Sequence, residues 1–420
     1  MRSSNTIIFD LTGEKVSAGI IGDAPGELMM LEEFAPDLRV ALGRVDGQIR
    51  AWMDAQSHGI PERLRSLVFD HLNDCLPRIE DEDLQSLIVA ALWRYLGDGC
   101  SERGLIAREA RTRAYVIVQN HPAPALERFR TACATEERIN LAAFPNEAAS
   151  LVMGAIESGE VRDVAAADCL MPAPVCLIVA YTDRHIEVCS FELMMVGKTK
   201  HRIFIRDFFR TGSADLAAEL QNRHVFEDLR LAVLFESSKL SERSQKSLQQ
   251  AVRGPSWKTA LSQRPLVELL VLKMRGAAHL VRETEGWSGR PVEYDIETAF
   301  NIGFRAEGER FQSVFTQDEL RGAVRYPVAS SGAFRFHPRP ANDVVIRACC
   351  GYSNRVEEST TLGELTIPRP DIDEIFRHKR AVLSMQIRLE SAGKGEFSLG
   401  ILPTGRTIGS QTFTIPSLMA

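Results

Sequence analysis

The sequence lacks the features that would indicate a metal centre, a membrane segment or a nucleic-acid surface. Its eight cysteines include no CxxC pair and no spacing typical of metal ligands. No apolar run approaches the ~20 residues of a membrane-spanning helix, and the stretch from Met1 to Asp10 is too short for the apolar part of a signal peptide. Acids and bases are mixed, with a formal net charge of -6. We therefore expect a cytoplasmic protein with buried, reduced thiols, no metal, and neither a membrane nor a nucleic-acid partner.

What the sequence does contain is a repeated pattern of apolar strands and helices. The chain has 420 residues, 45% of them hydrophobic, which is enough for two or three domains. Two apolar hairpins are predicted, one over Thr6–Phe9 and Val16–Ile21, the other about 170 residues later over Val175–Ala180 and His185–Phe191. A helix capped by Asn146 is predicted between them. A duplicated unit of hairpin, strand and helices is one way to build a cleft between two lobes.

The pattern of apolar and polar residues changes in the second half of the chain. The pattern is mainly helical from Leu216 to Gln250, Leu266–Leu272 reads as an apolar strand, and Asp295–Phe304 reads as a helix. From Gly332 on, short alternating strands with turn signals, over Val344–Ala348, Ala381–Leu389 and Glu396–Leu402, predict a separate all-β module. We place the boundary near Pro327 to Gly332, which gives domains 1–328 and 333–420.

The order of these segments resembles the nucleotide-binding domain of the DnaK-type heat-shock chaperones. Asn146–Val152 stands where that family has Asn-Glu-Pro-Thr-Ala-Ala-Ala, and Asp295–Gly303 is similar to its Pro-Asp-Glu-Ala-Val-Ala-Tyr-Gly helix. Thr361–Pro368 and Ala381–Gly400 resemble later strands of its peptide-binding β-domain. The resemblance implies a divergent, shortened member. Its fold would be an actin-like, two-lobed α/β domain (ribonuclease H-like and duplicated) plus a small C-terminal all-β domain without the family's helical lid.

The nucleotide site that the resemblance implies is largely altered. Phosphate loops need glycines, whose backbone N–H groups approach the phosphates closely. The first loop has one glycine displaced and gains a carboxylate, the second keeps no glycine, and the adenosine loop gains long side chains, as Lys273 illustrates. We therefore expect no cofactor, with ATP and Mg²⁺ bound weakly or not at all. The altered positions are Thr12, Gly13, Glu14 and Lys15 in the first loop, Thr182, Asp183, Arg184 and His185 in the second, and Arg275, Gly276 and Ala277 in the third.

Two acids are candidate catalytic residues, and each has a structural alternative. Asp10 either keeps a metal-water role or ends a strand and accepts backbone hydrogen bonds. Glu147 matches the acid that the family uses near the attacking water, yet it also complements the dipole of the helix it begins. Lys15 and Arg184 either hold an anion or are solvated loop charges. His185 is expected to be a packed or exposed histidine, because no Ser or Cys partner can be named for it.

The leading hypothesis is a chaperone-like, non-hydrolysing protein (a pseudo-ATPase) that binds a protein or peptide or acts as a scaffold. One alternative is an enzyme acting on a different small molecule in the rebuilt cleft, since fold does not fix function. A second alternative is an active ATP-dependent chaperone with unusual loops.

Overall fold

The structure of the 420-residue chain is a computed structural model with mixed α/β content, and its strands form five sheets within the described residues. The described residues are 6–13, 16–22, 27–35, 40–45, 48–53, 65–69, 82–105, 112–118, 123–134, 138–159, 161, 173–196, 200–225, 228–254, 256–287, 294–298, 300–306, 311–320, 327–334, 340–352, 359–377, 381–391 and 393–415.

The first sheet has the strand order β3-β2-β1-β7-β8. β1, β7 and β8 are parallel, whereas β2 runs antiparallel to both of its neighbours, which confirms the first predicted hairpin. Helices α2 and α3 accompany this sheet, and the ring of Trp93 on α2 packs edge-on against Phe9. The bounds are β1 Thr6–Asp10, β2 Val16–Ile21, β3 Leu28–Ala35, β7 Thr112–Ile117, β8 Ile139–Ala143, α2 Glu82–Glu102 and α3 Ala123–Cys133. A separate three-stranded sheet, β5-β4-β6, comprises β4 Val40–Val45, β5 Gln48–Met53 and β6 Arg65–Phe69.

The second sheet has the order β13-β12-β9-β10-β11-β14. Its β9/β10 hairpin confirms the second predicted hairpin, and β12 and β13 run parallel to β9. Apart from β14, this sheet therefore repeats the strand order and directions of the first. The prediction of a mainly helical stretch from Leu216 to Gln250 missed β12, a strand that is buried along its whole length. The bounds are β9 Ala173–Thr182, β10 His185–Val196, β11 Lys200–Thr211, α6 Leu216–Asn222, β12 Leu231–Ser237, α7 Glu242–Ala251, β13 Lys258–Arg264 and β14 Tyr294–Thr298.

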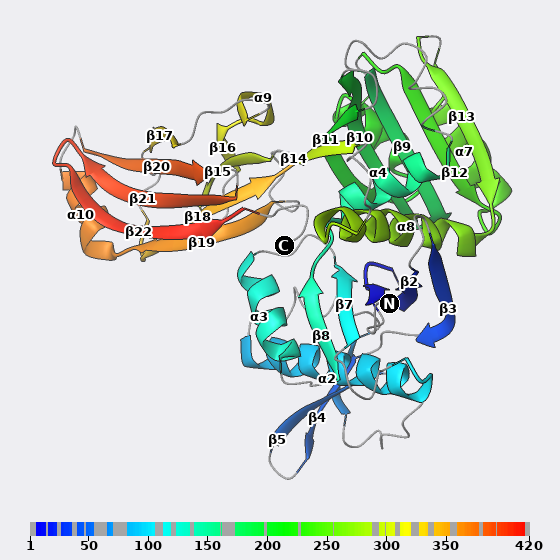
Figure 1. The fold of residues 1–420 in the computed structure, drawn as a ribbon. Helices are drawn as coiled ribbons and strands as arrows, with labels where there is room; N and C mark the ends of the chain where they lie inside the picture. The colour runs from blue at the N-terminus through cyan, green and yellow to red at the C-terminus, as the bar shows by residue number, and fades with distance from the viewer. Residues whose placement is uncertain are drawn as a thin grey trace.

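Two helices, α4 (Glu147–Glu157) and α8 (Leu266–Thr284), pack against each other, and α8 lies between the two sheets (Figure 1). Asn146 caps α4 as predicted, because its Oδ1 accepts a hydrogen bond from the Ala149 N–H at 3.0 Å. The strand predicted over Leu266–Leu272 is wrong, since these residues begin α8. A continuous apolar run fits a buried helix as well as a strand, so periodicity alone did not separate the two.

A charged group joins these two helices. His279 Nδ1 on α8 lies 3.1 Å from Glu157 Oε1 on α4, and its Nε2 lies 3.0 Å from Glu283 Oε1. Burial alone would lower the pKa of His279, but the neighbouring carboxylates of Glu157 and Glu283 outweigh it and raise the pKa from 6.5 to about 9. A pKa raised in the folded state gives stability that is fully present below pH 6.5 and is lost as the pH rises through about 9.

We therefore expect the wild-type chain to lose roughly 1–3 kcal/mol of unfolding free energy over this interval because of His279. Urea unfolding at a series of pH values measures the decline. His279→Gln should remove this part of the pH dependence while other titrations stay the same. If the unfolding free energies of wild type and His279→Gln changed with pH in the same way, the pH dependence would not come from His279.

The C-terminal part consists of two four-stranded sheets, β16-β15-β18-β19 and β17-β20-β21-β22, here called the β-module. The short strands expected at Val344–Ala348, Ala381–Leu389 and Glu396–Leu402 are confirmed by β18, β20 and β21. The bounds are β15 Asn301–Ala306, β16 Gln312–Phe315, α9 Gln317–Leu320, β17 Val328–Phe334, β18 Val344–Gly351, β19 Thr360–Ile367, α10 Arg369–Arg377, β20 Val382–Ser391, β21 Lys394–Leu402 and β22 Arg406–Thr414.

Two expectations about the start of the β-module are corrected. The helix predicted over Asp295–Phe304 is instead β14 followed by β15. The predicted boundary at Pro327 to Gly332 falls within the β-module, because Ser330 and Ser331 lie in β17 and pair with β20. The β-module therefore begins before the predicted division at 1–328 and 333–420, because β15 already pairs with β18. β14 itself joins the second sheet as a sixth strand, parallel to β11.

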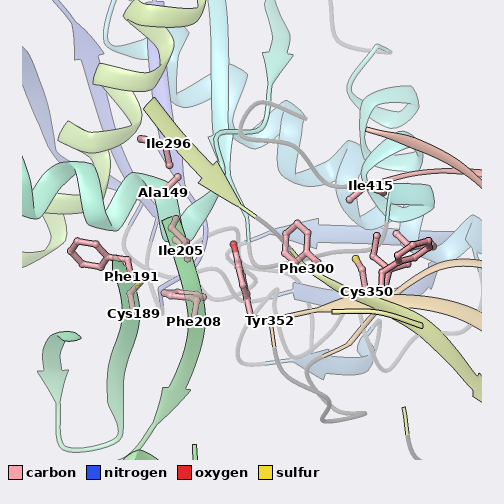
Figure 2. Close-up of a cluster of buried hydrophobic side chains, with 14 of the residues drawn as sticks. Ala149, Cys189, Phe191, Ile205, Phe208, Ile296, Phe300, Cys350, Tyr352 and Ile415 are labelled. Atoms are coloured by element: carbon pink, nitrogen blue, oxygen red, sulfur yellow. The ribbon is translucent and has the colours of Figure 1, made fainter. Parts of the chain in front are cut away.

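One hydrophobic core continues from the second sheet into the β-module. It runs from Ala149 on α4 through Ile205 and Phe208 on β11 to Tyr352 and Phe300 (Figure 2). The rings of Phe300 and Tyr352 lie 4.7 Å apart. Because buried apolar contacts of this kind are lost only when the parts separate, the β-module is held against the second sheet by packing as well as by β14.

The described cysteines are buried, as predicted. Burial raises the pKa of the Cys100 and Cys176 thiols to about 12, which disfavours the reactive thiolate at neutral pH. Cys75 and Cys169 lie outside the described residues. Within the described part of the chain, no helix is long and apolar enough to span a membrane.

Candidate functional site

Elements of both sheets meet at one buried group of polar side chains, here called the Lys273 cluster. The end of β1 and the first residue of α4 approach it from the first half of the chain, and β9, β10 and β11 approach it from the second. Lys273 enters from α8, which runs between the sheets. The cluster consists of Asp10, Thr12, Glu147, Tyr181, Glu187, Arg210 and Lys273.

Lys273 is at the centre of this cluster and is 2% exposed. Its Nζ donates hydrogen bonds to Thr12 Oγ1 at 2.8 Å and to one carboxylate oxygen each of Glu147 and Glu187 at 2.7 Å. A lysine ammonium has three N–H donors, so all three have an acceptor. Burial alone would lower the pKa of Lys273, but Glu147 and Glu187 outweigh it and raise the pKa above its usual value. The cluster therefore contains a charged ammonium group.

Glu187 is the most heavily hydrogen-bonded acid of the cluster. Its Oε1 also lies 3.3 Å from Arg210 Nη2 and 3.4 Å from His185 Nε2, and its Oε2 accepts the Tyr181 hydroxyl at 3.0 Å. Burial would raise the pKa of Glu187, but Lys273, followed by His185 and Arg210, holds it well below the usual range. Glu147 is likewise fully buried and pairs with Arg210 as well as with Lys273. Two carboxylates thus share two cations.

Asp10 and Thr12 attach the end of β1 to this cluster. The backbone N–H and the hydroxyl of Thr12 both donate to Asp10 Oδ1, at 2.9 and 2.6 Å. Burial raises the pKa of Asp10, while Lys273 and the Thr12 hydrogen bonds act in the opposite direction. Of the two roles left open for Asp10, this geometry fits the residue that ends a strand and accepts backbone hydrogen bonds. Glu147 begins α4, as the structural alternative requires, and it also forms ion pairs with Lys273 and Arg210.

The second-loop residues form the turn between β9 and β10. Thr182 Oγ1 accepts the His185 N–H at 3.1 Å, and Arg184 is exposed. Asp183 Oδ1 accepts the Ser241 N–H at 3.2 Å, and this hydrogen bond lowers the pKa of Asp183. Asp183 therefore binds the segment that starts α7. His185 does reach the Lys273 cluster, through Glu187 and through Tyr181, whose ring centroid lies 5.0 Å away.

The residues assigned to the adenosine loop do not form a loop. Arg275, Gly276 and Ala277 lie in the middle of α8, where Arg275 is exposed and the other two are buried. A Cβ on Gly276 would lie 1.7 Å from the carbonyl oxygen of Ser150 on α4, so the glycine permits a helix crossing rather than the approach of a base. In the first loop Gly13 is half-buried, whereas Glu14 and Lys15 lie outside the described residues.

Lys273 and Arg210 offset the negative charges of Glu147 and Glu187 within the cluster. Lys273 supplies positive charge directly between Glu147 and Glu187. A phosphate placed here would meet carboxylates, and like charges in a dry site repel strongly. In the part of the chain that the structure describes, no group of three or more His, Cys, Asp or Glu side chains is arranged to hold a metal ion.

Sequence reasoning did not identify the central residues of this cluster as site residues. Lys273 was noted only as a replacement of a glycine, and Glu187, Arg210 and Tyr181 were not singled out. One signal was present, since Lys273 and Glu187 each interrupt an apolar stretch. Charged side chains are almost never fully buried unless they are paired, so two opposite charges in two apolar elements indicate a buried ion pair.

Comparison with known proteins gives no family for this chain. No protein-family model matches it, and no curated protein matches it either. A function must therefore be argued from the Lys273 cluster and from the arrangement of the sheets.

Proposed function

We propose that this protein is a chaperone-like scaffold that binds a protein or peptide partner without hydrolysing ATP. We further propose that its α/β part is a degenerate actin-like domain of two ribonuclease H-like halves, similar to that of the DnaK-type chaperones. The fold proposal is supported by the strand orders β3-β2-β1-β7-β8 and β11-β10-β9-β12-β13, which share the same directions. The degenerate site is supported by the first two loops, because the glycine of the first is displaced and the second keeps none.

The observation that carries this proposal is the position of Lys273. Its ammonium group lies between Glu147 and Glu187 and also binds Thr12, which follows Asp10 in the first loop. A nucleotide with its metal would have to displace a buried, fully hydrogen-bonded cation. That displacement would leave Glu147 and Glu187 with less compensating charge, at a cost of several kcal/mol.

The attachment of the β-module supports a scaffold rather than a switch. β14 adds to the second sheet, and the hydrophobic core continues from β11 to Tyr352. A ligand shifts an equilibrium between two arrangements only by its differential affinity for them. Without nucleotide binding that contribution is absent, so the partner meets one arrangement of the two parts.

We expect isothermal titration calorimetry to detect no saturable binding of ATP with Mg²⁺ in the micromolar range. In a second measurement, the protein should suppress aggregation of a heat-unfolded client enzyme at near-equimolar concentration, equally well with and without ATP and Mg²⁺. Micromolar, Mg-dependent ATP binding would reject the non-hydrolysing part of the proposal. Failure to suppress aggregation, with a folded protein, would reject the chaperone-like part.

A further inference from the structure

The second sheet ends at β13, and one side of this strand has no partner strand among the described residues. β13 pairs with β12 alone, in an unbroken register from Lys258 to Arg264. Figure 1 shows it at the outer edge of the sheet. An edge strand of this kind is a template on which a segment of another chain can form a further strand. The free edge of β13 is therefore a candidate interaction surface.

Every second residue of β13 directs its backbone polar groups away from β12. The Lys258 N–H donates to the Arg230 carbonyl at 3.0 Å, and the Arg264 carbonyl accepts the Ser238 N–H at 3.1 Å, so both ends of the strand point toward β12. Successive residues of an extended strand point their N–H and C=O groups to opposite sides. The residues that point outward are therefore Thr259, Leu261 and Gln263.

Contacts within the chain hold this edge in place. Trp257 Nε1 and Thr259 Oγ1 both donate to the Val252 carbonyl at the end of α7, at 2.8 and 3.1 Å. At the other end of β13, the Arg264 guanidinium lies 4.9 Å from the centroid of the Phe235 ring. The strand is thus ordered before a partner arrives, which lowers the entropic cost of binding.

The side chains of β13 determine which strand fits it. Leu261, in the middle of the strand, is a large apolar side chain that is 42% exposed. Lys258 begins the strand and is exposed, and Arg264 ends it and is half-buried. Within the described ranges, the ammonium group of Lys258 forms no hydrogen bond or ion pair. An added strand would meet one apolar side chain between two positive charges.

The region around β13 is basic, although the chain as a whole is acidic. Residues 238–268 contain six basic and two acidic side chains, whereas the formal net charge of the chain is -6. The acidic residues are Glu242 and Glu268, and the basic ones are Lys239, Arg243, Lys246, Arg253, Lys258 and Arg264. All of the basic residues except Arg264 are exposed. The field at this edge therefore attracts negative charge.

The same charges disfavour a second copy of the chain as the partner. Antiparallel pairing of two β13 strands over their full length is centred on Leu261, and it places Lys258 of one copy opposite Arg264 of the other. Like charges directly opposite each other destabilise a strand pair, and lysine on an edge strand discourages pairing in general. Glutamate or aspartate opposite these two positions would form favourable pairs instead.

We propose that the free edge of β13 binds an extended acidic segment of a partner protein as an additional antiparallel strand. In this pairing an apolar residue of the segment lies opposite Leu261, and acidic residues three positions before and after it lie opposite Lys258 and Arg264. The inference rests on the proposed function, since it names the surface and the chemistry by which the scaffold holds its partner.

The test is calorimetry of the full chain with a synthetic peptide of nine residues, blocked at both ends. The peptide has valine at its centre, glutamate three positions to either side, and threonine elsewhere. It should bind saturably, one peptide per chain, whereas the same peptide with lysine in place of both glutamates should not. Lys258→Glu should weaken binding of the acidic peptide roughly tenfold, because a favourable charge pair becomes a repulsive one.

The matched control for this charge reversal is Lys394→Glu. Lys394 is also an exposed lysine that begins a strand, but its strand, β21, has neighbours on both sides. This variant should leave the affinity within about twofold of wild type, because remote exposed charges are screened.

A second pair of variants tests the backbone pairing. Leu261→Pro removes an outward N–H and leaves the hydrogen bonds to β12, a position where an edge strand tolerates proline. Leu261→Ala loses the same side chain but keeps the N–H. The proline variant should bind the acidic peptide about fivefold more weakly than the alanine variant, because one hydrogen bond is lost.

Any of three results overturns the proposal: no saturable binding of the acidic peptide, equal binding of the lysine peptide, or unchanged affinity in a folded Lys258→Glu variant. Saturable binding of single-stranded DNA without binding of the acidic peptide would do the same, since it would assign the basic region to another class of partner. If the acidic peptide does not bind but the protein suppresses client aggregation, only this inference fails. If aggregation is not suppressed, the proposed function itself fails.

Discussion

Replacing Lys273 with methionine is expected to lower the unfolding free energy by about 3–5 kcal/mol, the range found when one partner of a buried ion pair is removed. Methionine keeps most of the aliphatic packing of lysine, so the loss reports the ammonium group. Without the ammonium group, Glu147 and Glu187 stay buried, and Arg210 is then the cation that both of them contact. Chemical denaturation at neutral pH, compared with wild type, measures the change.

A double variant separates charge from packing in this experiment. Lys273→Met combined with Glu187→Gln removes one cation and one anion, and Glu147 keeps its ion pair with Arg210. The double variant should therefore be more stable than the sum of the two single losses predicts, by about 1 kcal/mol or more. A Lys273→Met protein within about 0.5 kcal/mol of wild type would mean that the ammonium group does not hold the cluster together.

The second large effect is expected at the crossing of α4 and α8. A Cβ on Gly276 would lie 1.7 Å from the Ser150 carbonyl oxygen, and one on Gly154 would lie 1.9 Å from the Leu272 carbonyl oxygen. Both obstacles are backbone atoms, so no side-chain rotation relieves the clash. Gly276→Ala should therefore destabilise the fold by about 3 kcal/mol or more, at or above the upper end of the range for overpacked cores. It should also displace Lys273, which is three residues away on the same helix.

The control for this prediction is the same substitution in another helix. On Gly97 of α2, a Cβ would meet only the end of the Arg138 side chain, at 3.3 Å. Gly97→Ala should leave stability unchanged or raise it by up to about 1 kcal/mol, because alanine is the better helix former. Thermal unfolding of the two variants gives the comparison. Equal, small effects at both positions would show that α4 and α8 are not in close contact.

Local sequence patterns were sufficient to predict the elements that turns and helix caps define. Both hairpins followed from alternating apolar residues around polar turns, and α4 followed from its Asn146 cap. β12 was misread because an element buried on all sides has no polar face to reveal its period, and α8 was misread because it begins with a nearly continuous apolar run. Whether Leu266–Leu272 forms a strand or a helix is decided by packing against α4, and a single sequence does not contain that information.

As with the fold, only part of the candidate site could be predicted from the sequence. Asp10, Thr12 and Glu147, which were singled out from the sequence, lie at or near the ends of predicted elements and all belong to the Lys273 cluster. Lys273 could not be placed, because the expected adenosine loop is part of a helix, and helical geometry directs this side chain into the space between the sheets. The error in secondary structure therefore became an error about the site.

The pairing of β14 with β11 has a consequence for how the chain avoids self-association. β11 would otherwise end the second sheet, and an uncovered edge strand presents a row of unpaired N–H and C=O groups that can recruit a strand of another molecule. Paired positions from His201 with Tyr294 to Ile205 with Thr298 cover the first part of that edge within the same chain. Proteolysis or heating that released β14 would expose it. The protection of this part of the β11 edge thus depends on a segment that follows the α/β part in the sequence.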